Sequence, residues 1–436
     1  MRMQIPTQVE QIINTLNKAG FEAYAVGGCV RDTLLGRTPG DWDITTSAHP
    51  EEVKRLFRRT IDTGIQHGTV TIMMDRTGYE VTTYRIDGEY EDGRHPKQVE
   101  FTSNLLEDLK RRDFTINAMA YSHETGIVDA FGGMEDLKNR TIRCVGDAME
   151  RFTEDALRIL RAIRFSAQLD FAIEQETWNG IFRIAPNIAK VSKERIQVEL
   201  TKLLLSDHPE RMRQVYETGI STYVSGAFAG LPWERMEIPA SLPAEKYVRW
   251  AAFLRCARLC EAADAPGTAV SAELASGTAA QTAVRVLKDL KLDNDTIAKV
   301  RTLVKWSGVE LEKQQDTLAQ GQAQTQGQEQ SEQPDGRPVS PAIVRRAMSQ
   351  MEPEVWDALL ELNDYDNEIR RLTEEIRAAG DCLDLKHLAV NGQDLIRAGV
   401  KPGKEMGVIL NHLLELVLEH PELNRREELL RHCQEA

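Results

Sequence analysis

Two carboxylates, Asp41 and Asp43, flank Trp42 just before the strand-like run Ile44 to Thr46. Side chains two residues apart on a strand point to the same face, so these two carboxylates are expected to converge. Converging carboxylates suit paired Mg²⁺ ions about 4 Å apart, which promote an in-line displacement at a phosphate. The competing interpretation is a surface Asp-x-Asp that binds no metal.

Gly27 and Gly28 follow the apolar run Tyr24 to Val26 and open a helical segment that ends near Gly36. At such a turn, backbone N–H groups can approach an anion, and the helix dipole favours its negative charge. An ordinary turn would show the same pattern. Together with the Asp-x-Asp downstream, however, the glycine pair favours phosphate chemistry.

Glu80 is a candidate third carboxylate for the metals. It lies on a predicted strand, Tyr79 to Arg85, which follows a predicted strand at Val70 to Met74. The residues between them, 75–78, carry the signal of a hairpin turn. Glu80 could equally be a solvated residue on the strand surface, and the sequence leaves both interpretations open.

Arg112 and Asp113 belong to a basic cluster that begins at Lys110. Beside a metal site, an Arg-Arg-Asp cluster can hold a triphosphate or a sugar while the aspartate orients one guanidinium. A basic triplet on its own is usually a solvated helix face. The function of this cluster therefore depends on what the fold brings next to it.

Asp155 and Arg158 are expected to share one face of a helix over residues 154–165, capped by Thr153, with Arg161 one turn further. The aspartate could accept a hydrogen bond from the exocyclic amine of cytosine or adenine, and the arginine could donate to a ring acceptor. Uracil and guanine present a carbonyl at that position and would be refused. An ordinary salt bridge between the two side chains is the alternative.

The periodicity of the chain predicts an α+β protein. Strand signals end near Asp129, and from about residue 146 the pattern is almost entirely helical. Residues 313–338 are rich in Gln and cannot bury much apolar area, so a flexible linker is expected there. A helical segment follows the linker.

Composition narrows the class of protein. The 436 residues are 41% apolar and 28% charged, which is typical of a soluble globular protein. No apolar run is long enough to span a membrane, and the N-terminus lacks the apolar core of a signal peptide. Only Cys256 and Cys260 form a close cysteine pair, so reduced thiols and a cytoplasmic location are expected. The net charge of −14 argues against non-specific coating of nucleic acid but permits a local basic track.

These motifs occur together in the order found in one enzyme family. The chain resembles the bacterial-type tRNA nucleotidyltransferases, the CCA-adding enzymes of the polymerase-beta-like nucleotidyltransferase and poly(A) polymerase family. The resemblance is carried by Gly27 to Asp43, the loop 85–96, Arg111 to Ala118, Phe131 to Gly133, Glu154 to Arg161, Lys193 to Ile196 and Asn391 to Leu395.

The resemblance implies an architecture of head, neck, body and tail, in which a mixed β-sheet head precedes helical parts. The expected parts are a catalytic head 1–145, a base-selecting neck 146–207, a tRNA-binding body 208–312, the linker 313–338 and a tRNA-binding tail 339–436. The composition of the loop 85–96 leaves two interpretations open, a plain surface connection and a lid that closes on a nucleotide.

The resemblance also implies roles for individual residues. Asp41 and Asp43 would hold Mg²⁺, Asp155 and Arg158 would select the base, and Arg161 would add a phosphate contact. Contacts to the triphosphate or ribose are expected from Gly27, Gly28, Arg31, Asp32, Arg112 and Asp113. The implied reaction is addition of C, C and A to tRNA, held by its acceptor and TΨC arm, from CTP and ATP. A homodimer is possible, and no membrane partner is expected.

Three other functions compete with this one. A poly(A) polymerase, or an enzyme that adds only CC or only A, would share the same head, although CC-only relatives tend to lack the loop 85–96. A non-catalytic RNA-binding protein could keep the fold but would not need Asp41, Asp43 and Asp155. A small-molecule nucleotidyltransferase would not need so long a helical remainder.

Overall fold

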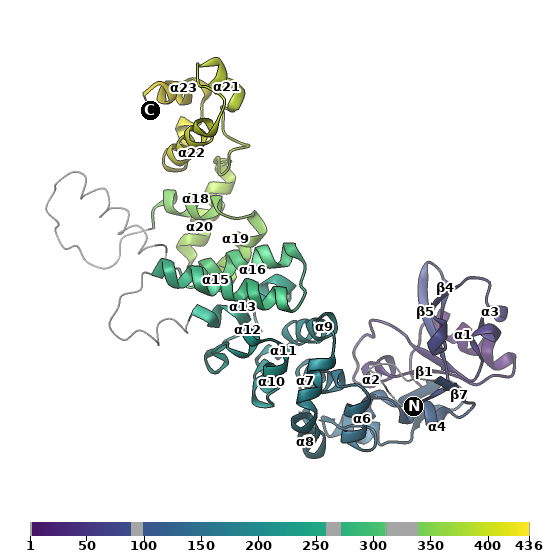
Figure 1. Ribbon diagram of the computed structural model, residues 1–436. Helices are drawn as coiled ribbons and strands as arrows, with labels where there is room; N and C mark the ends of the chain where they lie inside the picture. The colour runs from purple at the N-terminus through teal and green to yellow at the C-terminus, as the bar shows by residue number, and fades with distance from the viewer. Residues whose placement is uncertain (1, 89–98, 259–271, 310, 312–338, 436) are drawn as a thin grey trace. The chain divides into compact units, whose positions relative to one another are not determined.

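The computed structural model describes residues 2–88, 99–258, 272–309, 311 and 339–435 (Figure 1). The chain forms two compact units. One comprises Met1–Cys260 with Val284–Asp293, and the other comprises Glu261–Ala283 with Asn294–Ala436. The predicted linker 313–338, residue Cys260 and most of the predicted loop, 89–96, lie outside the described residues.

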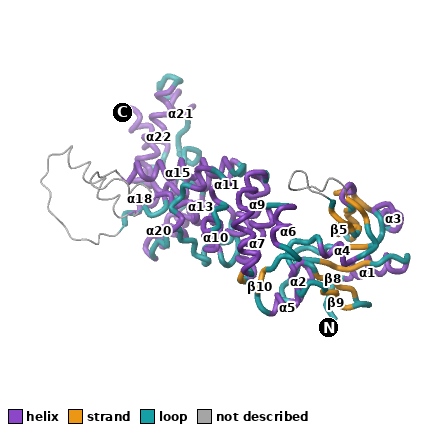
Figure 2. The backbone as a smooth tube through the Cα atoms, turned by 60° about the horizontal axis from the view of Figure 1, so that its bottom comes forward, coloured by secondary structure: helices purple, strands orange, loops and turns teal. Residues whose placement is uncertain are grey.

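A seven-stranded mixed sheet forms the N-terminal part of the first unit, with the order β3-β4-β5-β2-β1-β8-β9. Figure 2 shows the strands, in orange, gathered in this part of the chain, while helices follow. Neighbouring strands are antiparallel, except that β2 and β5 run parallel. The strands are β1 Ala23–Val26, β2 Ile44–Thr46, β3 Thr60–Gly64, β4 Thr69–Met74, β5 Thr77–Thr83, β8 Met119–Ser122 and β9 Gly126–Asp129. The helices of this part are α1 Thr7–Lys18, α2 Gly28–Leu34, α3 Pro50–Leu56, α4 Leu105–Lys110 and α5 Gly133–Lys138.

The predicted hairpin at residues 75–78 is confirmed. Asp75 and Arg76 both hold positive φ, 48° and 67°, as the two central residues of a tight hairpin turn require. The predicted loop 85–96 is wrong at its start, because β6 Arg85–Asp87 pairs with β7 Val99–Phe101. The paired residues lie twelve or more positions apart in the sequence. The composition of a short segment does not predict a pairing over that distance.

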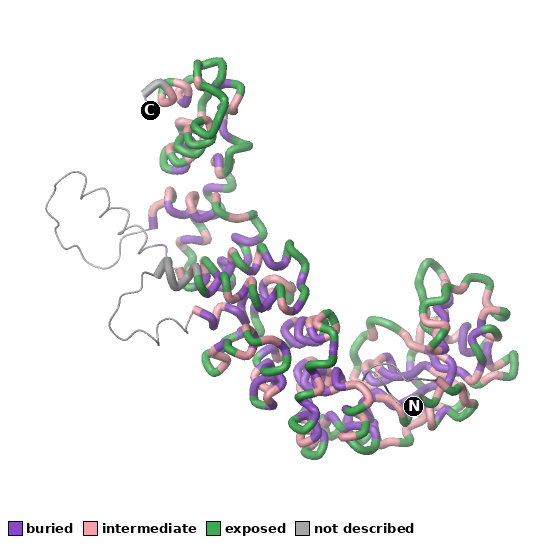
Figure 3. The backbone as a smooth tube through the Cα atoms, viewed as in Figure 1, coloured by how far each residue is buried: buried purple, intermediate pink, exposed green. Residues whose placement is uncertain are grey.

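The first unit continues as helices, apart from a short parallel pair formed by β10 Thr141–Ile142 and β11 Ala172–Ile173. Helices α7 and α9 pack against each other, and each carries buried aliphatic side chains, such as Ile163 on α7 and Leu200 on α9. Figure 3, viewed as in Figure 1, shows much of this part of the chain as buried. The predicted fold class, α+β with a mixed sheet followed by helices, is confirmed. The helices are α6 Ala148–Glu154, α7 Leu157–Leu169, α8 Gln175–Ile184, α9 Lys193–Leu204, α10 Arg213–Glu217, α11 Ser221–Val224, α12 Gly226–Ala229 and α13 Lys246–Leu254.

The second unit consists of helices in its described part. Its core includes Trp356, which is fully buried and donates from Nε1 to Thr373 Oγ1 at 3.2 Å. A separate apolar cluster near the C-terminus is built around Leu395, Leu413 and Val417. The helices are α15 Ala272–Asp289, which ends in the first unit, α16 Asn294–Trp306, α18 Pro341–Ser349, α19 Pro353–Leu362, α20 Asn367–Ala379, α21 Gly392–Arg397, α22 Lys404–Glu419 and α23 Arg426–Glu435.

Among the described residues, no helix combines the length and the apolar character that crossing a membrane requires.

Packing around Gly133 gives a test of the fold. A Cβ at this position would overlap the backbone oxygen of Thr115 and lie 2.9 Å from Met119 Cγ. We expect Gly133→Ala to lower the free energy of unfolding by about 2 kcal/mol, measured by urea denaturation. Gly226→Ala is the matched control, since no described atom lies within 4 Å of the position that its methyl group would take. Equal stability of the two variants would contradict the packing described for Gly133.

Candidate active site

The sheet register brings three segments of the site together: the turn after β1, the residues before β2 and the middle of β5. Val26 N donates to Asp43 O at 3.0 Å, so the turn at Gly27 begins beside Asp43. Ile44 pairs with Val81 on the parallel strand β5, and this places Glu80 next to the residue that precedes β2. Gly27 has a φ of +82°, which glycine adopts at little cost. The glycine turn and the carboxylates thus lie together beside the interior strands β1, β2 and β5.

The charges around Asp43 are unfavourable to its ionised form. Burial raises the pKa of Asp43 to about 6, and the nearby charges of Asp41 and Glu80 act in the same direction, while Arg112 opposes them. A carboxylate in such a place gains stability when a cation binds, because the cation offsets both the burial and the repulsion. The predicted convergence of Asp41 and Asp43 agrees with this coupling.

The donor chemistry of Asp41 and Asp43 fits a divalent metal. Mg²⁺ is typically bound through one or two carboxylates, and phosphate oxygens and water complete its coordination. Within the described ranges, no group of three or more His, Cys, Asp or Glu side chains is arranged to hold a metal. A ligand role for Glu80 therefore stays a prediction, although its charge reaches Asp43.

Arg112 lies directly over the glycine turn. A Cβ on Gly27 would come within 2.9 Å of Arg112 Nη1, so the guanidinium occupies the space that a side chain would fill. Its Nε is buried and finds no hydrogen-bond partner among the described residues, and its Nη2 lies 3.7 Å from Asp108 Oδ2. The Arg112 guanidinium therefore lies near the carboxylate of Asp43, and its Nε–H group donates no hydrogen bond within the described part of the chain.

Arg31 and Asp32 are engaged with the protein itself. Arg31 donates from Nε and Nη2 to the two carboxylate oxygens of Asp32, each at 2.9 Å. Its Nη1 donates to Asn117 Oδ1 at 2.6 Å, and its Cζ lies 5.0 Å from the ring centroid of Phe165. In this arrangement Arg31 orients its neighbours, and a direct contact of Arg31 or Asp32 with a nucleotide stays a prediction.

Asp113 connects the sheet region to helix α7. Its Oδ2 accepts from Arg161 Nε at 2.8 Å and lies 2.6 Å from Arg161 Nη2, and its Oδ1 accepts from Asn117 Nδ2 at 3.1 Å. Burial alone would raise the pKa of Asp113, but the charges of Arg161 and Arg158 and these hydrogen bonds hold it well below its ordinary value. Asp113 is therefore a carboxylate that orients a guanidinium, but that guanidinium belongs to Arg161 on α7, while Arg111 and Arg112 of the Arg-Arg-Asp cluster lie beside Asp108.

Asp155 and Arg158 do not form the salt bridge that was the alternative to base selection. Asp155 Oδ2 accepts from Arg195 Nη2 at 2.7 Å, whereas Arg158 Nη1 donates to Glu154 Oε2 at 2.6 Å. The predicted helix 154–165 is present from Leu157 onward as α7, but its predicted start and its cap at Thr153 are wrong, because Thr153 lies inside α6. The backbone is extended at Asp155, with φ −144°, before α7 begins. Because the helix is interrupted at Asp155, the rule that residues three apart share one helix face does not apply to Asp155 and Arg158.

A cavity of about 280 Å³ nevertheless collects both residues beside the Arg-Arg-Asp cluster. Its charge is strongly positive, since five arginines face two aspartates, as a triphosphate site requires. Gly27, Gly28, Arg31, Asp32 and the carboxylates Asp41, Asp43 and Glu80 are not part of its lining. The lining residues are Arg111, Arg112, Asp113, Asp155, Leu157, Arg158, Arg161 and Arg195.

Arg195 is the main site residue that the sequence did not single out. It stands in the segment Lys193 to Ile196, where the pattern assigned no role to any one side chain. Its contact with Asp155 joins residues forty positions apart, on α9 and before α7. Only the packing of α9 against α7 reveals this contact.

Family models match three parts of the chain. The poly A polymerase head domain matches residues 23–143, and a probable RNA and SrmB-binding site of polymerase A matches residues 170–226. A third model, tRNA nucleotidyltransferase domain 2, matches residues 353–432.

Whole-chain comparisons point to one family. A CCA-adding enzyme of Levilactobacillus brevis is 38% identical over 405 residues, covering 92% of this chain and 91% of that protein. A CCA-adding enzyme of Leuconostoc mesenteroides is 52% identical over 227 residues, which span 51% of this chain and 57% of the relative. The crystal structure of the Bacillus stearothermophilus CCA-adding enzyme in complex with CTP matches with a TM-score of 0.72 and 31% identity, covering 99% of this chain and 98% of that one.

The ion pair of Asp113 predicts a pH-dependent stability. Because its folded pKa lies below the ordinary value of about 3.9, the carboxylate stabilises the fold above that pH and loses this effect as the pH falls. We expect Asp113→Asn to cost about 2 kcal/mol at pH 7, discounted for the partial exposure of Arg161. The gap to the unsubstituted protein should shrink between about pH 5 and pH 2.

Urea unfolding across this pH range measures the gap. Asp62→Asn, at an exposed carboxylate paired with Lys54, is the control and should show little change at any pH. A gap for Asp113→Asn that stays constant on acidification would contradict the assignment.

Proposed function

This chain belongs to the family of CCA-adding enzymes, and on that basis we propose that it adds C, C and A to the 3′ end of tRNA from CTP and ATP. The reaction is template-independent: the 3′-hydroxyl of tRNA attacks the α-phosphate and pyrophosphate leaves. The observation that carries the proposal is the basic cavity in which Asp155, Arg158 and Arg195 face Arg112 and its cluster. We expect the enzyme to act in the cytoplasm, where its substrates are present.

The metal of this reaction is expected to be Mg²⁺, held by Asp41 and Asp43. Nucleotidyltransferases of this family generally use a divalent metal. When bound, the metal would lower the charge on the phosphates and favour ionisation of the attacking hydroxyl. Asp41 and Asp43 would hold the metal near the α-phosphate. The charge of Glu80 would keep the electrostatic potential around the metal negative.

Arg112 and Arg161 would bind the triphosphate. Arg112 lies over Gly27 with a buried Nε that has no partner in the described part of the chain, and Arg161 is held in one orientation by Asp113. Fixed guanidiniums stabilise the charge that develops on the leaving pyrophosphate without reorganising during the reaction. The backbone at Gly27 and Gly28 would contact the same phosphates, while Arg31, Asp32 and Asn117 would maintain the geometry.

Asp155 and Arg158 would select the base. Asp155 is fixed by Leu157 N at 3.1 Å on one oxygen and by Arg195 on the other, and each oxygen keeps a further lone pair for an exocyclic amine. Arg158 would donate to N3 or O2 of cytosine, or to N1 of adenine. Uracil and guanine would place a carbonyl against Asp155 and leave buried groups unpaired, which disfavours them strongly.

The helical remainder would bind tRNA. We propose that the body 208–312 and the tail 339–436 hold the acceptor and TΨC arm through shape and backbone contacts, as duplex RNA is generally read. The head 1–145 and the neck 146–207 would then receive its 3′ end. The matches of the RNA-binding and tRNA nucleotidyltransferase models to parts of these segments support this assignment.

Incorporation of nucleotides tests the function directly. With Mg²⁺, CTP and ATP, the purified chain should extend tRNA that lacks its 3′ end by CCA and then stop. Asp41→Ala should lower the rate by ~10³-fold or more while tRNA affinity changes by less than about twofold. Asp62→Ala, an exposed carboxylate in the same region, is the control and should leave both unchanged.

Other products would identify the competing functions. Long adenylate tails made from ATP alone would indicate a poly(A) polymerase, and a product that stops after CC or receives only A would indicate an enzyme of narrower output. Tight tRNA binding with no incorporation would indicate a non-catalytic RNA-binding protein. Parallel loss of activity and tRNA affinity in Asp41→Ala would contradict the metal role.

Base selection is tested with Asp155→Ala. Loss of the carboxylate removes the penalty against a base carbonyl, so the preference for CTP over UTP should fall by about 10²-fold. The ratio of kcat/KM for the two nucleotides measures this change. Glu194→Ala, beside Arg195 on α9, should keep the preference. Unchanged selectivity in Asp155→Ala would exclude Asp155 from base recognition.

A further inference from the structure

The aromatic ring of Phe165, on α7, lies among three guanidinium groups. The Cζ atoms of Arg164, Arg31 and Arg161 are 3.8, 5.0 and 5.4 Å from the centroid of this ring. All three distances fall within the range of about 6 Å over which the electron-rich face of an aromatic ring attracts a cation. Phe165 is only 6% exposed, so water screens this attraction little.

The ion pair of Arg161 leaves the guanidinium group one freedom of movement. Arg161 Nε donates to Asp113 Oδ2 at 2.8 Å, and its Nη2 lies 2.6 Å from the same oxygen. Because both contacts end on one atom, the guanidinium plane can still tilt about that oxygen, unlike in a fork that uses both carboxylate oxygens. The distance from Arg161 Nη1 to Glu199 Oε1, 3.8 Å, is too long for a hydrogen bond. The face of the Phe165 ring is therefore what restricts the tilt of this guanidinium.

The ring of Phe165 is itself fixed by packing. Phe114 contacts it edge-on, with ring centroids 5.8 Å apart and an interplanar angle of 82°, and Phe114 is fully buried. Arg31 belongs to α2, directly after the glycine turn, whereas Arg161 belongs to α7. One rigid ring thus contacts cations from both sides of the candidate active site.

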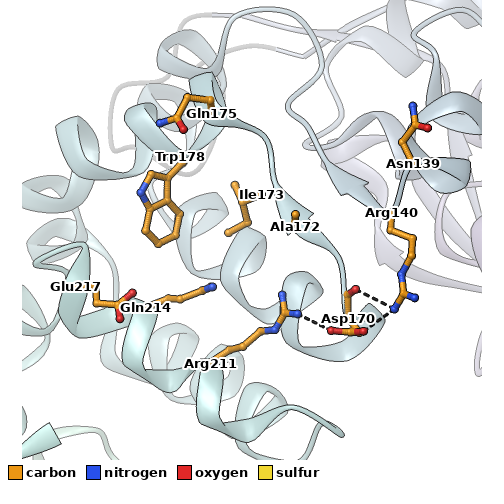
Figure 4. A pocket seen from close by; sticks show the side chains of 10 residues that line it. All are labelled: Asn139, Arg140, Asp170, Ala172, Ile173, Gln175, Trp178, Arg211, Gln214 and Glu217. Carbon is orange, nitrogen blue, oxygen red and sulfur yellow. Dashed lines mark hydrogen bonds and ion pairs between the residues drawn. The ribbon is translucent and has the colours of Figure 1, made fainter. Parts of the chain in front are cut away.

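Helix α7 is held in place independently of this ring. Its C-cap is Asp170, whose two carboxylate oxygens lie 2.5 Å from Arg140 Nη2 and 2.5 Å from Arg211 Nη2. Figure 4 shows these two ion pairs, which line a separate cavity of about 680 Å³. A change confined to the electrons of the Phe165 ring therefore leaves α7 where it is.

We propose that Phe165 is a positioning residue for nucleotide transfer: the face of its ring holds the Arg161 guanidinium in the plane that binds the triphosphate and couples it to Arg31 beside the glycine turn. This inference rests on the proposed function, in which Arg161 contacts the triphosphate. Phe165 acts through Arg161 and is not itself a contact of the nucleotide. A guanidinium kept in one plane stabilises the charge on the leaving pyrophosphate without reorganising during the reaction.

Fluorination of the ring tests the proposal, because fluorine weakens the attraction between the ring face and a cation while changing the size of the ring little. Monofluoro-, difluoro- and trifluorophenylalanine are incorporated in place of Phe165 in the full chain. Affinity for CTP, measured with Mg²⁺ and without tRNA, should fall at each step and reach a loss of about fivefold to tenfold. The kcat at saturating CTP should fall along the same series, whereas tRNA affinity should change by less than about twofold.

The same fluorinated series at Phe228 is the matched control. Phe228 is also buried and stacks on Tyr216, with ring centroids 5.2 Å apart, in the helical part of the first unit. Fluorination there should leave CTP affinity unchanged. A loss of affinity that is graded at Phe165 and absent at Phe228 would support the proposal. Folded Phe165 variants with equal CTP affinity across the series would overturn it.

Thermal unfolding separates failure of this proposal from failure of the proposed function. Each added fluorine at Phe165 should lower the Tm of the chain, and it should lower the Tm by less in an Arg161→Gln background, where that guanidinium is missing. A chain that binds no CTP would contradict the proposed function, and this comparison would still decide whether the ring holds Arg161. Equal Tm shifts in the two backgrounds would overturn the proposal.

Discussion

The candidate active site depends on one buried carboxylate, Asp113. Removing a carboxylate from water is costly, and here Arg161, Asn117 and a backbone N–H offset that cost by filling both of its oxygens. Asn117 also accepts from Arg31, so a single network joins the helix after the glycine turn to helix α7. The glycine turn of the candidate active site and the cavity lined by Asp113 are therefore positioned by the same hydrogen-bond network.

Two aspartates in this region have pKa shifts in opposite directions, and the cause of each shift separates their roles. Asp43 is partly buried and lies near the charges of Asp41 and Glu80, so its ionised form is disfavoured and a cation would offset both effects. Asp113 is surrounded by guanidiniums, so its charge is already compensated within the protein. The first arrangement is typical of a ligand-binding carboxylate and the second of a structural one. Arg112 lies between the two environments and influences Asp43 directly.

Much of the fold follows from local patterns. Turn signals predicted the hairpin of β4 and β5, and the change to helical periodicity predicted the largely helical remainder, in which β11 is an exception. The division into head, neck, body, linker and tail rests on composition and on the family resemblance. The pairing of β6 with β7 was missed because it joins residues on either side of a polar, glycine-containing segment that carries no strand signal.

Local sequence determined which chemical groups this protein has and roughly which elements carry them: the glycine pair after a strand, Asp41 and Asp43 before a strand, and the arginines among helical residues. These features depend on neighbours within a few positions. The tertiary structure alone decided which charges meet. Asp155 contacts Arg195 rather than Arg158 because the helix breaks at Asp155 and α9 packs against α7. Ion-pair partners depend on the relative placement of distant elements, and hydrophobic packing sets that placement without leaving a local pattern.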